Sequence, residues 1–203
     1  MRKLNEALRR EVLKTIGDLF IRAGFGKLTA VNFSLTINSE AVGLVGLPVI
    51  TQPGEIGLHV APSLGLRHEE LEKLVCELTG REFDEGTTAS LGIVLGYLMP
   101  ERSYLEFPFS PDIVTEVAEE LAAALVEYGV PWMKAHVSLE QILEELLNMR
   151  YTYRDAARLR IPACHYLMGE PDRAKSIWNR NFWRSGTPTT SSQISTGVSP
   201  AVS

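Results

Sequence analysis

The stretch AVNFSLTINSEAVGLVGLPVITQPGEIGLHV, residues 30–60, decides the fold of this chain. Apolar and polar residues alternate over 31–38, a period of two that is typical of a strand with one buried face. Residues 38–40 are short enough for a tight turn, residues 42–50 are apolar on both faces, and residues 56–60 alternate again. The stretch therefore predicts three antiparallel strands, the second of them central in the sheet.

The flanking sequence predicts helices and two further strands. Helices are expected over residues 3–22, 67–79, 110–128, 138–147 and 152–160, shorter ones over 163–168 and 171–183, and strands over 89–99 and 104–109. Prolines on both sides of the last strand favour an edge position for it. We therefore expect an α+β protein, with a five-strand, mainly antiparallel sheet that helices pack against one face.

Three regions follow from the composition along the chain. Residues 1–148 are expected to form the α+β domain, and residues 149–185 a helical region packed on it. Residues 186–203 carry no charge and are rich in Ser and Thr. Such a tail buries too little apolar surface to order itself and is predicted to be disordered.

The bulk composition restricts the function classes. The net charge is −5, which disfavours nucleic acid as the main partner, because binding there depends on neutralising phosphates. No apolar run is long enough to cross a membrane, and the first 28 residues are charged and amphipathic, unlike a signal peptide. With only two cysteines, far apart in the sequence, we expect free thiols in a cytoplasmic protein.

Charge is unevenly distributed along the chain. Residues 1–28 carry seven Lys/Arg and three Asp/Glu, and residues 149–184 carry eight and three. Residues 29–100 carry three and nine, and residues 101–148 two and ten. Either the basic ends pack against the acidic middle and neutralise it, or the two signs form separate faces that bind partners.

Motifs for catalysis or metal binding are absent from the sequence. It contains no HExxH or CxxC pattern, no GxSxG elbow and no phosphate-binding loop with GxxxxGK spacing. His59, at the end of the third strand, and His68, at the start of the next helix, are the residues around which a small-molecule cleft could form. We expect no catalytic residues, no metal site and no cofactor.

Two groups of side chains are the candidate binding residues. One is the exposed side of helix 110–128, which has acidic residues and no Lys or Arg; its candidates are Glu116, Glu119 and Glu120. The other is an arginine stripe interleaved with aromatics in residues 150–184, a composition found at protein hot spots and in single-stranded nucleic-acid sites. Its candidates are Arg150, Arg154, Arg158 and Trp178.

Residues 3–148 follow the order helix, three strands, helix, two strands, helices. This layout resembles small uncharacterised bacterial α+β domain families, some of which are treated as immunity-like proteins. The resemblance implies a bacterial, non-enzymatic protein that binds a macromolecule, as an inhibitor of a toxin does. We therefore expect a protein partner, and two alternatives stay open: an enzyme or small-molecule binder near His59 and His68, or nucleic-acid binding through residues 150–184. The sequence leaves the oligomeric state open.

Overall fold

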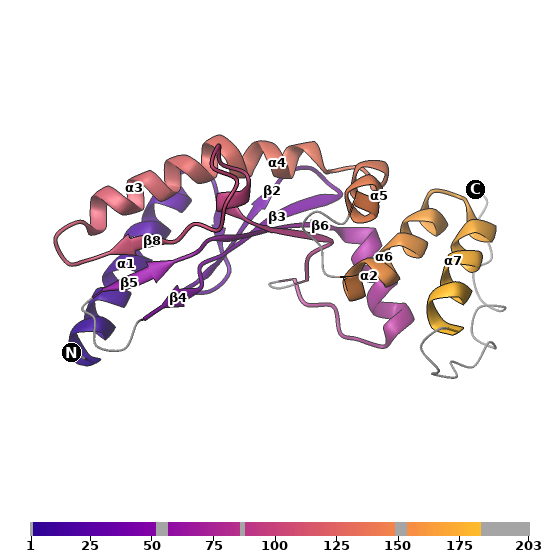
Figure 1. Cartoon of the computed structure of the whole chain (residues 1–203), viewed down its shortest axis with the longest axis horizontal. Coiled ribbons are helices and arrows are strands. Elements are labelled where there is room, and N and C mark those ends of the chain that lie inside the picture. The colour runs from indigo at the N-terminus through magenta and orange to yellow at the C-terminus, as the bar shows by residue number, and fades with distance from the viewer. Residues whose placement is uncertain (1, 52–56, 86–87, 149–153, 184–203) are drawn as a thin grey trace.

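The computed structural model describes residues 2–51, 57–85, 88–148 and 154–183, and in this part the chain is an α+β protein with two antiparallel sheets (Figure 1). The strands are β1 (Gly26–Lys27), β2 (Asn32–Thr36), β3 (Ala41–Gly46), β4 (Val49–Ile50), β5 (Leu58–Val60), β6 (Ser63–His68), β7 (Leu91–Val94) and β8 (Phe107–Phe109). The helices are α1 (Arg2–Arg22), α2 (Glu69–Thr79), α3 (Val114–Ala124), α4 (Val130–Ala135), α5 (Leu139–Asn148), α6 (Arg154–Leu167) and α7 (Pro171–Trp183). A 3₁₀ turn, η1 (Leu95–Tyr97), and a π-helical turn, η2 (Leu125–Gly129), complete the described elements. The predicted fold class is confirmed.

The larger sheet has five strands in the order β1-β2-β3-β6-β7. Its β2–β3 hairpin is the one that the alternating sequence predicts, with Phe33 opposite Val45. The Asn38 side-chain oxygen accepts the backbone N–H groups of Glu40 and Ala41, at 2.9 and 2.7 Å, and closes the turn. A short side chain that satisfies the backbone of its own turn is the usual role of Asn there.

The inner strand β6 is not predicted from the sequence. The sequence predicts that a strand closes at Pro62 and that a helix begins at residue 67, whereas residues 63–68 pair with β3 on one side and β7 on the other. Helix α2 starts only at Glu69, with His68 as its N-cap, and it ends at Gly80 in the left-handed conformation, as predicted. Burial between two neighbouring strands outweighs the helical appearance of residues 67 and 68.

The predicted strand over 42–50 is split between two sheets. β3 lies in the larger sheet, and β4 lies in a smaller one with the order β4-β5-β8. The break falls at Pro48 and, on the partner strand, at Pro62. Proline has no N–H for the ladder, and a long hydrogen bond of 3.4 Å from Ala61 to the Pro48 carbonyl spans the gap.

Helices cover one face of the five-stranded sheet. The register puts Phe33, Gly43 and Leu64 on this face. Phe33 is fully buried, its ring meets the backbone of α1 at Gly17, and Gly43 leaves room for Met133 of α4. Figure 1 shows α4 over β2 and β3, while α3 lies over α1 and β8. The opposite face carries Ser34 and Ser63 together with apolar residues such as Leu44.

The predicted strand 89–99 and helix 110–128 both have different bounds in the structure. The strand ends at Val94, and the chain turns into η1. The helix starts at Val114 rather than 110, and it does not stop at Gly129 but passes through η2 into α4. Pro131 has no N–H to donate, and in a regular α-helix its ring would clash with the carbonyl one turn earlier. The wider π turn, in which the Val130 N–H reaches the Leu125 carbonyl, relieves this clash.

The C-terminal helices form a hairpin. Residue 160 was the predicted end of one helix, yet α6 continues through Pro162 to Leu167, because packing against α2, α5 and α7 outweighs the local cost of the proline. Gly169, in the left-handed conformation, makes the turn to α7. The predicted helix opening at 152 and the tail 186–203 lie outside the described residues.

Candidate functional site

The acidic side of α3 is the first candidate surface. Val117 and Leu121 are buried against the core, and the opposite side of the helix presents Glu116, Glu119 and Glu120 to solvent. Helix α1 packs along α3 and holds it in place. Among the described residues, no Lys, Arg or His forms an ion pair with these three carboxylates. Their charge is therefore directed to solvent or to a partner.

Three tyrosines lie near the C-terminal end of this acidic side, Tyr97 and Tyr104 exposed and Tyr128 half-buried. The turn η1 packs on η2, which brings the segment after β7 next to the end of α3. A hydrogen bond to Glu127, with smaller contributions from burial and from the Glu101 charge, raises the pKa of Tyr128. Burial and a hydrogen bond to Glu106 raise the pKa of Tyr104. We call Glu116, Glu119, Glu120, Glu127, Tyr97, Tyr104 and Tyr128 the acidic–tyrosine surface.

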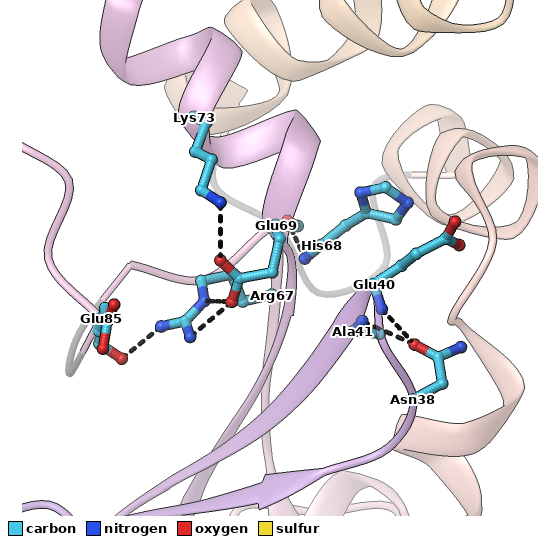
Figure 2. A network of polar contacts seen from close by, with 9 residues as sticks. Asn38, Glu40, Ala41, Arg67, His68, Glu69, Lys73 and Glu85 are labelled. Atoms are coloured by element: carbon cyan, nitrogen blue, oxygen red, sulfur yellow. Dashed lines mark hydrogen bonds and ion pairs between the residues drawn. The ribbon is translucent and has the colours of Figure 1, made fainter.

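A second set of polar residues gathers where β6 meets α2 (Figure 2). Arg67 is buried, and its Nε and Nη2 atoms donate to one oxygen of Glu69 at 2.8 and 2.7 Å. Its Nη1 donates to the Glu85 carbonyl, and the Phe83 ring lies 5.3 Å from its guanidinium carbon. Because these partners engage all three guanidinium nitrogens, Arg67 holds the loop after α2 onto the sheet.

His68 belongs to the same junction. Its backbone N–H donates to Ser90 Oγ at 3.0 Å, and its Nδ1 is the weak cap of α2, 3.5 Å from the Leu71 nitrogen. His59, in contrast, lies on β5 in the smaller sheet, where its Nδ1 is 3.2 Å from Glu106. The length of β6 separates the two histidines. The structure therefore does not bring them together into one cleft.

A buried ion pair joins α2 to α6. Glu72 is fully buried, and both of its oxygens accept hydrogen bonds of 2.7 Å from the Arg160 guanidinium. Burial, followed by the nearby Glu72 charge, raises the pKa of the Cys164 thiol to about 12. Cys164 is thus a protonated core residue, and a thiolate nucleophile is not available there at neutral pH.

The arginine stripe is only partly within the described residues. Arg150 lies outside them, and Arg154 is on α6 with a side chain that is outside the description. Arg158 is exposed on α6, and Trp178 is half-buried on α7. Figure 1 shows α6 and α7 at the opposite end of the molecule from α3, so the structure does not bring the two candidate groups together.

The described residues contain no group of three or more His, Cys, Asp or Glu side chains placed to hold a metal ion. Within the same part of the chain, none of the helices has the length and apolar character that crossing a membrane requires. Comparison with known proteins gives no matching family model, no matching curated protein and no matching solved structure. The functional conclusion therefore rests on the side chains themselves.

Sequence reasoning missed the buried charges Arg67, Glu72 and Arg160 as a set. A signal for Glu72 was present, because at helical spacing it falls between Val75 and Cys76 on the apolar side of α2. A carboxylate in an apolar stripe predicts a basic partner from elsewhere in the chain. Spacing alone does not identify the arginine that pairs with Glu72, because tertiary packing brings the two residues together.

Proposed function

We propose that this chain is a non-enzymatic binding protein whose acidic–tyrosine surface receives a basic protein partner. The observation that carries the proposal is the row of exposed carboxylates on α3, which no basic side chain of the described residues neutralises. A rigid helix that presents charge of one sign steers a partner of opposite charge and accelerates its association.

The neighbouring tyrosines support the same proposal. Tyr97 and Tyr104 are 38% and 52% exposed, so their rings are accessible to a partner. Tyrosine is enriched at protein interfaces, and its ring can also receive the cationic side chain of Lys or Arg. An inhibitor of a basic toxin, which the layout resemblance implies, is one instance of this class of protein.

The cysteines fit action in the cytoplasm, which we include in the proposal. Cys76 and Cys164 are both free and buried, and a reducing compartment keeps such thiols unpaired. Among the alternatives, a ligand cleft between His59 and His68 is less supported, because they lie on different sheets.

Capture at low salt tests the proposal. The immobilised chain is exposed to extract of its own cells at about 50 mM salt, where surface charge is weakly screened. The test variant is E116K/E119K/E120K. The matched control is E70K/E77K/E144K, which changes the net charge equally at three other exposed carboxylates.

We expect one basic protein on the wild type and on the control, and its loss from the α3 variant and from the wild type at about 500 mM salt. With the purified partner, the association rate constant should fall on the order of tenfold or more as salt rises through this range. Capture of the same proteins by all three chains, or of none, contradicts the proposal.

A further inference from the structure

The outer edge of β7 is a second feature of the molecule that could bind a partner. β7 is the last strand of the five-stranded sheet, and its inner neighbour is β6. The Leu95 N–H bonds to the Pro62 carbonyl at 2.9 Å, and in an antiparallel ladder such bonded pairs alternate. Ile93 is therefore bonded to β6, while Gly92 and Val94 turn their backbone groups to the outside.

Three backbone groups on this edge are open. They are the N–H and C=O of Gly92 and the N–H of Val94, since the Val94 carbonyl starts the 3₁₀ turn η1. No hydrogen bond of the described residues reaches them. Both residues are half-buried rather than covered. Unpaired edge groups of this kind are a template for another strand.

The other sheet edges are protected. β1 and β4 are only two residues long, and β8 carries Pro108, which has no N–H. Short strands and prolines are ordinary means of preventing edge pairing. β7, with the sequence Leu-Gly-Ile-Val, has neither a proline nor a charged residue.

The surroundings of β7 define what would fit beside it. A Cβ added at Gly92 would meet only the Leu64 carbonyl, at 3.7 Å, so the space above this residue is open to a large side chain from a neighbouring strand. The loop before β7, residues 81–85, carries three carboxylates and one arginine. On the helix α5, which packs on β7, Glu140 and Glu144 are exposed. Charge complementarity therefore favours a basic segment.

We propose that β7 accepts an extended, positively charged protein segment as a sixth strand, with an aromatic or large apolar side chain over Gly92. Backbone hydrogen bonds at Gly92 and Val94 supply the pairing, and the acidic surroundings select Lys or Arg at the flanking positions. This site is separate from α3, and it does not depend on the function proposed for the acidic–tyrosine surface.

The substitution Val94→Pro tests the pairing. Val94 has φ −85° and ψ 136°, which a proline adopts, and its N–H is not part of the ladder with β6. The variant thus removes an outward donor and leaves the sheet bonds in place. Val94→Thr is the matched control, because it keeps the N–H and the branched side chain. The probe is a displayed library of random dodecapeptides, selected on the wild type at low salt.

We expect selected peptides with several Lys or Arg and one aromatic residue. Their affinity should fall about tenfold or more in Val94→Pro and stay unchanged in Val94→Thr. In the wild type, bound peptide should slow hydrogen exchange at the Gly92 and Val94 amides, a readout that stands even where the proline variant is poorly folded.

Selected peptides that bind Val94→Pro as tightly as Val94→Thr overturn the proposal, and so does a selection that enriches none above the Val94→Pro background. Peptides lost from E116K/E119K/E120K but kept by Val94→Pro bind α3 instead. That result would contradict strand addition and leave the function proposed for α3 intact.

Discussion

Replacing Arg160 with methionine removes the basic partner of Glu72 while it keeps most of the apolar stem. The side chain of Glu72 is 1% exposed and that of Arg160 is 13% exposed, so water cannot replace the two lost hydrogen bonds of 2.7 Å. Leaving one charge of a buried pair alone costs about 3–5 kcal/mol. In a chain of this size each kcal/mol lowers the melting temperature by about 2–4 °C.

We therefore expect Arg160→Met to melt about 6–20 °C below the wild type. The double variant E72M/R160M should recover most of this loss, because it removes the buried charge as well as its partner. Thermal and urea unfolding of the three chains measure both effects. Arg173→Met is the control: its pair with Glu170 is long, at 3.5 Å, and exposed, so its cost should stay within about 1 kcal/mol.

Two results would refute this reasoning. If Arg160→Met melts within about 2 °C of Arg173→Met, the pair does not hold α6 onto α2. If E72M/R160M is as unstable as the single variant, the cost comes from lost packing of the arginine stem rather than from an unpaired charge.

Three further predictions test other parts of the fold. The pKa of the Cys164 thiol is about 12 in the folded chain and about 9 in the unfolded chain, so the folded state binds the proton more tightly. The free energy of unfolding should therefore fall as the pH rises from 9 towards 12, by up to about 4 kcal/mol. Cys164→Ala should flatten that part of the unfolding free energy against pH, and parallel curves would contradict it. Gly96→Ala should cost about 1–3 kcal/mol in urea unfolding, because its Cβ would clash with the Ser103 carbonyl oxygen; unchanged stability would mean that this turn shifts without cost. Ser138→Ala removes the capping box with Gln141, where each side chain bonds the other's backbone N–H at 3.3 and 3.1 Å, and should cost about 1 kcal/mol by thermal melting; no change would mean that the cap is replaced by water.

Local signals explain what could be predicted from the sequence. The β2–β3 hairpin, the end of α2 at Gly80 and the capping box at Ser138 each depend on residues within a few positions of one another. The candidate carboxylates of α3, such as Glu116, were also found this way, since a helical period separates an acidic side from an apolar one.

Tertiary contact explains what could not be predicted. Residues 63–68 contain one glycine, Arg67 and His68, and only pairing with β3 and β7 makes them a strand. Pro131 and Pro162 are strong local signals for a helix end, yet both lie within continuous helical segments that are packed on several sides. The partner of Glu72 is 88 residues away in sequence, beyond the reach of any periodicity.

The two proposed surfaces depend on salt in different ways, because they use different forces. Association through the carboxylates of α3 is electrostatic, so screening at high salt should weaken it strongly. At β7, backbone hydrogen bonds at Gly92 and Val94 supply part of the binding, and these are not screened in the same way. A partner held mainly by α3 therefore dissociates at high salt, whereas a segment added to β7 loses only the contribution of its flanking Lys or Arg. The residual affinity at high salt thus separates charge recognition from strand addition for any partner that is found.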